Sequence, residues 1–395
     1  MKLNKNGWQV KSLSEVAEIV TGGTPSTAIK EYWENGNVPW LNSGELNQGI
    51  VTSSSNYITQ LGLKNSVAKL LPPDTILIAL TGATTGRVGY LTFEACANQS
   101  VTGILPSANH DPKFLYYFLQ TLRVNILKIA WGGAQKHINQ KFVKELKIPL
   151  PPLPIQKQIA EILEKADEAK QKRKEANKLT DEFLQSVFIE MFGDPVKNPK
   201  GWERKKILDL ISKIENENPL SFPAKEYDYI DISSIDNVLK TIIEIKKING
   251  KNAPSRARQL VKCNDVLVST VRPNLNAVTI VKENFSNPIA STGFCILRAN
   301  SKFVVPEYLF QITKQSFFIE ILSQMAKGAS YPAVTDVQII EIEISVPPLS
   351  LQQQFAELVN KTEALKEKQK QSELELENLF QSLMQRAFKG ELVLN

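Results

Sequence analysis

The chain has 395 residues, of which 42% are hydrophobic and 22% charged, so it can fill the cores of two or three folded domains. Its net charge of +6 favours a polyanionic partner only weakly, because many enzymes are as basic. No apolar run reaches the roughly 18 residues of a membrane span, and no signal-peptide core follows Met1, which predicts a cytoplasmic protein. Three scattered cysteines and two histidines exclude a disulfide framework and supply no zinc motif.

The first globular region is predicted to span residues 1–150. Its apolar run from Val38 ends in polar groups, which is typical of a strand with a loop at its tip. Asn42 and Ser43 lie at this tip. These two side chains could contact a ligand or could simply form the turn, and the sequence favours neither interpretation.

A buried strand from Asp74 to Leu80 leads into the glycine hairpin 81–87. A phosphate-binding loop would need G-x-x-x-x-G-K-[ST], but this hairpin has one residue too few between its glycines, and Arg87-Val88 follows them. The pattern therefore argues against a nucleotide site. Arg87 is instead a candidate for contact with a nucleic acid.

An aromatic helix is predicted from Pro112, with its rings in the core, and the glycine loop 131–138 follows it. Gln135 on this loop can make a two-point contact with adenine, and Lys136 can reach a phosphate or guanine. The alternative is that the loop only caps the preceding helix, with Gln135 bonded to the backbone.

Residues 151–193 are predicted to form a long helix with apolar side chains at heptad spacing. Proline begins the helix, and Gly193-Asp194-Pro195 ends it. We expect the following residues to line a seam with a second helix or to dock another subunit: Ile155, Ile159, Ile162, Ala169 and Phe183.

The second half repeats this order, with a globular region at 194–346 and a long helix at 347–395. The helices align without a gap when Ile155 is placed on Leu351, an offset of 196 residues. The second seam comprises Leu351, Phe355, Leu358, Leu365 and Leu379. The second set of candidate DNA contacts comprises Arg272, Asn274, Lys327 and Tyr331. Around residues 270–274 the glycines of the first hairpin are missing, and the two hairpins share only hydroxyl groups and one arginine, Arg87 or Arg272.

Two matched helices about 150 residues apart indicate that they pair with each other within the chain. The predicted fold class is therefore α+β, with two globular α/β domains joined by two long helices that form an intramolecular antiparallel coiled coil. The alternative is that each helix is solvated and packs only on its own domain.

No catalytic constellation emerges from the sequence. There is no G-x-G-x-x-G after a strand, no G-x-S-x-G and no tetrapeptide of an amino-methyltransferase. Asp194 and Glu203 faintly resemble part of a nuclease core, but they straddle the end of a helix and the start of a domain. We therefore predict no catalytic residue and no metal site.

These features together resemble the specificity (S) subunit of a type I restriction-modification system. The resemblance covers essentially the whole chain and depends on the duplicated order of domain and helix, the entry 149–153 with Gln156, and the loops 81–86 and 132–135. It implies two target-recognition domains, each reading half of a bipartite site in duplex DNA.

The same resemblance implies that the coiled coil sets the half-site spacing and docks two methylation subunits, with restriction subunits added in the full complex. S-adenosylmethionine, ATP and Mg are then expected only on those partners, and neither catalysis nor a membrane is expected of this chain. Two alternatives remain: a stand-alone DNA methyltransferase or nuclease, and a duplicated protein-binding scaffold. Salt-sensitive binding of duplex DNA would distinguish the scaffold from DNA recognition.

Overall fold

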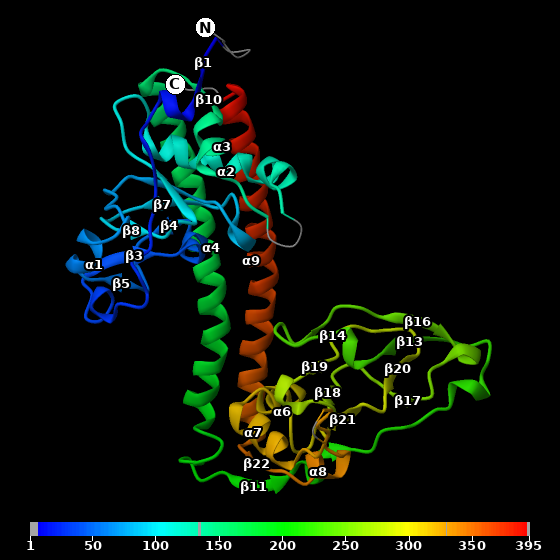
Figure 1. Cartoon of the computed structure of the whole chain (residues 1–395). Coiled ribbons are helices and arrows are strands. Elements are labelled where there is room, and N and C mark those ends of the chain that lie inside the picture. The colour runs from blue at the N-terminus through cyan, green and yellow to red at the C-terminus, as the bar shows by residue number, and fades with distance from the viewer. Residues whose placement is uncertain (1–6, 133–135, 329, 393–395) are drawn as a thin grey trace. The chain divides into compact units, whose positions relative to one another are not determined.

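The computed structural model describes residues 7–132, 136–328 and 330–392. The chain divides into two compact units, which are treated separately: unit 1 is Met1–Glu175 with Lys370–Asn395, and unit 2 is Ala176–Gln369 (Figure 1). Each unit holds a globular part and a portion of both long helices, α4 (Leu153–Phe192) and α9 (Leu349–Lys389). Among the described helices, none is long and apolar enough to cross a membrane.

Unit 1 contains a five-stranded sheet, a three-stranded sheet and a two-stranded ribbon (Figure 1). The five strands, in spatial order, are β2 (Ile19–Thr21), β9 (Val101–Ile104), β6 (Ile76–Ala79), β7 (Val88–Leu91) and β4 (Ile50–Val51). The remaining strands are β5 (Tyr57–Ile58), β3 (Val38–Leu41) and β8 (Cys96–Ala97), and the ribbon β1 (Gln9–Ser12) with β10 (Lys147–Leu150). The helices are α1 (Gln60–Lys64), α2 (Pro112–Ile129) and α3 (Gln140–Glu145).

Helix α2 shows how the sequence builds the core of unit 1. Asp111 caps the helix by accepting a hydrogen bond from the backbone N–H of Phe114 at 2.9 Å, and Pro112 occupies the first turn, where its missing N–H costs nothing. The aromatic side chains of its first two turns are buried, as the sequence predicted. They pack against β6, whose four residues are all fully buried.

Unit 2 also contains two main sheets, but its strands are distributed differently, as two four-stranded sheets and two ribbons. Its first sheet has the order β12 (Ile211–Ser212), β21 (Phe294–Ala299), β18 (Val266–Ser269) and β19 (Val278–Ile280). Its second has the order β16 (Lys246–Asn249), β13 (Glu226–Ile230), β20 (Pro288–Ser291) and β17 (Ala257–Leu260). Two ribbons pair β11 (Glu203–Lys206) with β22 (Glu343–Val346), and β14 (Ile235–Asp236) with β15 (Thr241–Ile242). The helices are α5 (Ile207–Leu210), α6 (Pro306–Thr313), α7 (Ser316–Met325) and α8 (Asp336–Ile340).

Within unit 1, the beginning of α4 packs against the end of α9. Buried Leu163 lies in one hydrophobic cluster with Met384. Further along α4, Lys170 forms an ion pair with Glu377 at 3.0 Å, and its Nζ lies 4.0 Å from the ring centre of Phe380. Residue numbers rise along α4 as they fall along α9, so the two segments are antiparallel.

Within unit 2, the end of α4 packs against the beginning of α9 in the same way. Phe188 and Phe192 contact the ring of Phe355, with ring centres 5.6 and 5.3 Å apart. Gln369 donates a hydrogen bond from Nε2 to Oγ1 of Thr180 at 2.9 Å. This pairing is also antiparallel, so the predicted coiled coil is present in each unit.

Phe183, Leu365 and Leu379 do not line the seam, because they are 49%, 48% and 52% exposed, and their docking of another subunit stays a prediction. Ile159 and Phe355 are buried, and the remaining predicted residues are partly buried or half exposed: Ile155, Ile162, Ala169, Leu351 and Leu358. A straight helix drifts by about 20° per heptad against a seven-residue repeat, so the buried face moves to neighbouring positions. Polar Thr362 and Gln369 take inner positions because each is hydrogen-bonded.

A buried glutamine attaches each long helix to its globular part. Gln156, which is 1% exposed, accepts a hydrogen bond from the backbone N–H of Asp111 at 2.9 Å and donates one to the carbonyl of Pro151 at 2.8 Å. Gln352, which is fully buried, does the same with Val305 at 3.0 Å and Pro347 at 2.8 Å. Its amide also donates to the carbonyl of Phe303 at 3.2 Å.

Candidate nucleic-acid interface

The predicted glycine hairpin of unit 1 is a short 3-10 turn, Gly82–Thr84, between β6 and β7. Gly82 and Gly86 have φ angles of 75° and 72°, in the left-handed region that favours glycine. A Cβ at Gly86 would lie 3.1 Å from Ile126 of α2, so the turn also sits close to that helix. The hairpin thus has two left-handed positions that fix its path.

The loop after α2 is fastened to this hairpin by backbone groups. The carbonyl of Lys136 accepts hydrogen bonds from the N–H of Gly82 at 3.0 Å and from Oγ1 of Thr85 at 2.7 Å. The Nζ of Lys136 donates to the carbonyl of Leu127 at 2.5 Å and so caps the end of α2. This helix cap is the alternative role considered for the loop, and a DNA contact by Lys136 stays a prediction. Gln135 lies outside the described residues.

A second arginine lies near Arg87 in unit 1. Burial, and then the neighbouring charge of Arg87, lower the pKa of Arg123 on α2. The Nε atoms of both side chains are buried and have no hydrogen-bond partner among the described residues. Two neighbouring cations repel each other, so an anion placed between them would be bound favourably. Sequence analysis missed Arg123 because 35 residues separate it from Arg87 and only the packing of α2 brings them together.

The other predicted tip of unit 1 has a structural use. The side chain of Asn42 accepts a hydrogen bond from the N–H of Gly44 at 2.8 Å, and its own N–H donates to Glu45 at 2.9 Å. Asn42 therefore caps the turn Ser43–Gln48. Ser43 is half exposed beside it. Contacts of Asn42 and Ser43 with DNA stay predictions.

The corresponding hairpin of unit 2 keeps the turn although it has lost the glycines. Arg272 and Asn276 have φ angles of 49° and 46°, and they flank the 3-10 turn Pro273–Leu275. The N–H of Arg272 donates to the carbonyl of Pro332 at 2.7 Å, as Gly82 does to Lys136 in unit 1. The glycines are missing here, but the turn persists, because arginine and asparagine adopt the left-handed conformation in their place.

The two arginines are not at equivalent positions, contrary to the sequence-based match. In unit 1 the N–H of Ala79 donates a hydrogen bond to the carbonyl of Arg87 at 2.9 Å. In unit 2 the N–H of Ser269 donates the matching bond to the carbonyl of Ala277, also at 2.9 Å. Arg87 therefore corresponds to Ala277. Arg272 instead occupies the place of Gly82. The arginine of unit 2 therefore lies at the start of the turn, whereas the arginine of unit 1 lies after it.

In unit 2 the arginine is paired with the predicted aromatic residue. The guanidinium carbon of Arg272 lies 4.9 Å from the ring centre of Tyr331, which is 70% exposed. Such stacking holds the guanidinium plane in a fixed orientation while its N–H groups stay available to an acceptor. Asn274 and Lys327 are both exposed on the same two loops. These residues form a compact cationic and aromatic surface suited to DNA.

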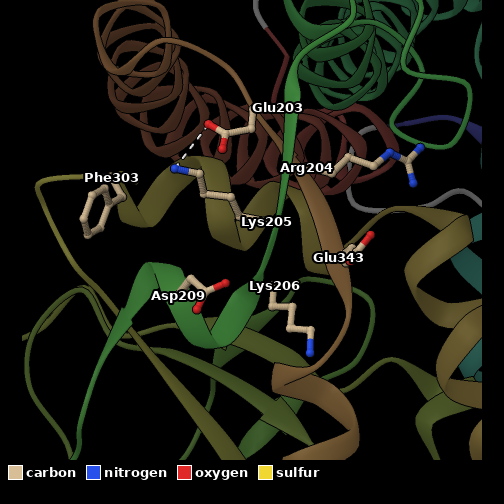
Figure 2. Close-up of a pocket in the computed structure, with 7 residues that line it drawn as sticks. All are labelled: Glu203, Arg204, Lys205, Lys206, Asp209, Phe303 and Glu343. Atoms are coloured by element: carbon tan, nitrogen blue, oxygen red, sulfur yellow. Dashed lines mark ion pairs between the residues drawn. The ribbon is translucent and has the colours of Figure 1, made fainter.

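The residues that faintly resembled a nuclease core have other partners. The carboxylate of Asp194 accepts hydrogen bonds from the N–H groups of Val196 and Lys197 at 2.8 and 3.0 Å. Glu203 forms an ion pair with Lys205 at 3.2 Å and lines a shallow pocket of about 450 Å³ in unit 2 (Figure 2). In the part of the chain that the structure describes, no three acidic, histidine or cysteine side chains are grouped to hold a metal ion.

Comparison with known proteins gives a duplicated match to one family model. The model of the type I restriction modification DNA specificity domain matches residues 5–180 and again residues 199–377. The type I restriction enzyme MjaIX specificity subunit of Methanocaldococcus jannaschii is 28% identical over 229 residues, which are 53% of this chain and 52% of the relative. The chain thus spans about half the length of that relative.

Two further comparisons extend over nearly the whole chain. The MjaVIII specificity subunit of the same organism is 23% identical over 412 residues, covering 98% of this chain and 93% of the relative. The crystal structure of the type I restriction-modification S subunit from M. genitalium matches with a TM-score of 0.60 and 16% identity, covering 98% of both chains. That structural likeness establishes the fold.

Proposed function

Because the chain belongs to the family of type I restriction modification DNA specificity domains, we propose that it is the sequence-recognition subunit of a type I restriction-modification complex. Each globular part reads one half of a bipartite site in duplex DNA. The observation that carries this proposal is the double match of the domain, at 5–180 and 199–377, together with the same fastening of two loops in both units.

The two sets of loops divide the work between anchoring and reading. In unit 1 the neighbouring Arg87 and Arg123, whose Nε atoms have no hydrogen-bond partner among the described residues, supply positive charge for a phosphate. In unit 2 Arg272, oriented by Tyr331, is suited to a two-point contact with guanine. Gln135, Lys136, Asn274 and Lys327 are further candidate contacts on the same loops.

In this proposal, the partner subunits carry the catalytic activities. Methylation subunits, two per chain, dock on the long helices, and restriction subunits join in the full complex. S-adenosylmethionine, ATP and Mg are bound there and not by this chain. The relatives are specificity subunits, which supports a role without catalysis.

Replacing one globular part tests the division into half-sites. Residues 1–150 are exchanged for the same region of another family member, and the methylated sequence in cells is read before and after. One half of the recognised site should change while the other half and the gap stay the same. A change in both halves, or in neither, contradicts the proposal.

Removing the paired cations of unit 1 tests the anchoring role. In the complex with methylation subunits, the variant Arg87→Gln/Arg123→Gln should bind all duplexes more weakly. The slope of log K against log salt should become shallower by about one unit, because one phosphate contact is lost. Lys147→Gln, a change at an exposed lysine of the ribbon β1–β10, is the control. Loss of sequence choice without a change in the salt slope would assign these arginines to base reading.

The long helices are proposed to set the distance between the half-sites. One heptad inserted in α4, with a matching heptad in α9, keeps the apolar face in phase and adds about 10 Å, roughly three base pairs of duplex. The gap in the methylated sequence should lengthen while both half-sites persist. A four-residue insertion rotates the apolar face away from its partner and should abolish assembly.

A further inference from the structure

Unit 2 carries a small hairpin whose tip is apolar and exposed. The strands β14 and β15 pair antiparallel, and the turn between them presents Val238 and Leu239, which are 86% and 66% exposed. These two side chains are called the apolar tip. An apolar pair this exposed has no use within the chain's own core, which points to an outside partner.

The apolar tip is held in place by its own turn. The carboxylate of Asp236 accepts hydrogen bonds from the N–H of Val238 at 2.7 Å and from that of Leu239 at 2.8 Å. Lys240 closes the turn with a φ of 58° and a hydrogen bond from its N–H to the carbonyl of Asp236 at 2.8 Å. These two backbone hydrogen bonds stabilise the ionised carboxylate and lower the pKa of Asp236. The tip is therefore presented in an ordered way.

The hairpin is also tied to the candidate DNA-reading loop. The Nζ of Lys240 donates a hydrogen bond to the carbonyl of Asn276 at 2.5 Å. Asn276 is the left-handed residue that ends the turn begun by Arg272. The apolar tip and the stacked guanidinium of Arg272 thus belong to two segments that share one direct bond.

Unit 1 has no such hairpin in its described residues. After the capped turn Ser43–Gln48, a single residue, Gly49, leads into β4, which pairs with β7. In unit 2 the corresponding turn, Ile232–Ser234, is followed instead by the ribbon β14–β15. Among the described residues, the apolar tip is therefore a feature of the second globular part alone.

The charge around the tip favours a polyanion over an apolar or basic partner. Residues 231–276 contain eight lysine or arginine residues and four aspartate or glutamate residues. Asp231 is paired with Lys246 at 2.6 Å, and Asp236 is bonded to its own turn. Positive charge therefore dominates the exposed surface of this segment.

We propose that Val238 and Leu239 insert as a wedge between base pairs of duplex DNA next to the bases read by Arg272. Apolar side chains that enter a base step partly unstack it and bend the duplex, while flanking cations hold the phosphates. The energy of unstacking depends on the step, so the wedge adds sequence choice at a position without hydrogen bonds to bases. This inference rests on the proposed function.

The test uses the full complex with methylation subunits and a duplex that carries its methylated sequence. Val238→Ser/Leu239→Ser should bind this duplex roughly 10- to 100-fold more weakly, because two aliphatic side chains lose their buried contacts. The fluorescence of 2-aminopurine placed beside the second half-site should rise on binding of the unaltered complex and rise less with the variant. Val337→Ser, at a 64% exposed valine of α8, is the matched control and should leave both readouts unchanged.

The outcomes separate the wedge from other roles of the tip. Unchanged affinity and fluorescence in the variant, with sequence choice intact, would overturn the wedge and leave the proposed function standing. Loss of methylation subunits from the purified variant would overturn it in favour of a protein-docking tip. If the unaltered complex shows no sequence choice at all, the proposed function itself fails. Thermal melting of the variant should match that of the unaltered chain, because the tip lies outside the core.

Discussion

The two globular parts share the pairing of two central strands, β6 with β9 and β18 with β21, but they carry different kinds of side chain at one cross-strand position. In unit 1, Ile76 of β6 pairs with Ile104 of β9, which places Thr75 opposite Leu105. In unit 2, Val266 of β18 pairs with Leu297 of β21, which places Asp265 opposite Arg298. A threonine and a leucine in one part thus correspond to an ion pair in the other.

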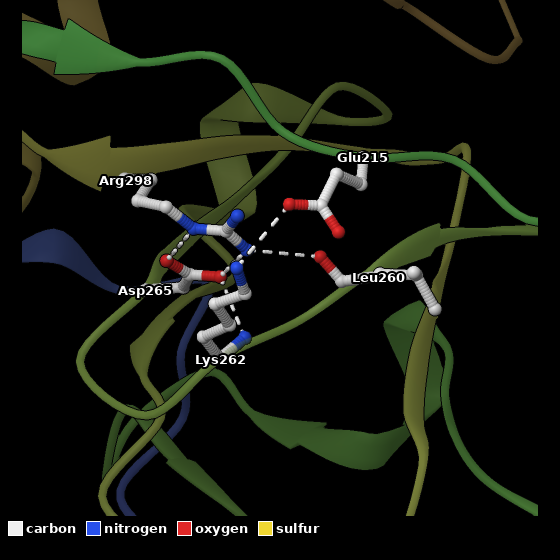
Figure 3. Close-up of polar contacts among 5 residues, drawn as sticks. All are labelled: Glu215, Leu260, Lys262, Asp265 and Arg298. Atoms are coloured by element: carbon white, nitrogen blue, oxygen red, sulfur yellow. Dashed lines mark hydrogen bonds and ion pairs between the residues drawn. The ribbon is translucent and has the colours of Figure 1, made fainter.

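The carboxylate of the ion pair in unit 2 is buried, and both of its oxygens accept hydrogen bonds. Arg298 donates to Asp265 from Nε at 2.9 Å and from Nη2 at 2.7 Å, and Nη2 also donates to the carbonyl of Leu260 at 3.0 Å (Figure 3). The N–H of Lys262 donates to the same carboxylate at 2.8 Å. Asp265 is 1% exposed, and the hydrogen bond to it raises the pKa of Arg298. Duplicated folds can therefore keep a backbone while exchanging an apolar contact for a charged one.

The largest expected effect comes from breaking this pair. Arg298→Leu leaves a buried carboxylate without its partner and should destabilise unit 2 by about 3 to 5 kcal/mol. The double variant Asp265→Thr/Arg298→Leu copies the side chains of unit 1 and should recover most of that loss. Urea unfolding measures both variants. Lys262→Met, at the exposed pair with Glu215, is the control and should cost under about 1 kcal/mol. A double variant as unstable as the single one would contradict the equivalence.

A second comparison concerns the glutamines that seat the helices. Gln156→Leu and Gln352→Leu each leave a buried backbone N–H and carbonyl without their bonds, which should cost about 1 to 3 kcal/mol. The loss at Gln352 should be the greater, because it makes three such bonds against two at Gln156. Chemical denaturation measures the difference. The exposed Gln354→Leu is the matched control, and equal loss at all three positions would contradict the seating role.

The left-handed turn positions allow a smaller test. Gly82 has open space where a Cβ would lie, so Gly82→Ala measures backbone strain alone and should cost about 1 kcal/mol. Gly82→Asn should cost less, because asparagine tolerates this conformation, as it does at Asn276. Thermal unfolding of the two variants decides the matter. An alanine variant as stable as the asparagine variant would show that the turn relaxes out of the left-handed region.

The smallest effect is a dependence on pH. His110 is buried in unit 1, bonded through Nδ1 to Ser107 at 3.0 Å, and burial lowers its pKa. The matching residue before the second aromatic helix is Val304, which is also buried. Because the pKa of His110 is lowered in the folded state, the unfolded chain takes up a proton at a higher pH than the folded chain. Neutral His110 therefore contributes its full stability above the unfolded pKa of about 6.5, and the free energy of unfolding decreases as the pH falls below that value.

The difference between the unaltered chain and His110→Val isolates this contribution. The variant should lose less stability than the unaltered chain between about pH 7 and pH 5, by no more than about 1.4 kcal/mol per pH unit for one proton. Thermal melts across this range measure it. Parallel melting curves for the two proteins would show that the imidazole does not titrate differently in the folded and unfolded states.

The sequence could predict the duplication, the two long helices and the aromatic helices, because apolar spacing and the proline and glycine at their ends are local signals. It could not predict that Phe183 and Leu365 leave the seam, since drift of the helix and satisfied polar pairs depend on the partner helix. The left-handed Arg272 and the neighbour Arg123 were equally inaccessible, because contacts distant in sequence create both features.

The hydrogen bonds of Gln156 and Gln352 have a consequence for the exchange of globular parts during evolution. Among the described residues, the partners of these two amides are all backbone groups of the globular part or of the helix entry. Hydrogen bonds to backbone groups do not depend on which side chains the globular part carries. Recombination between related genes could therefore deliver a foreign globular part to the same helix without compensating mutations at the junction. In such a lineage the surface that we propose to meet DNA can diverge rapidly while the attachment stays fixed.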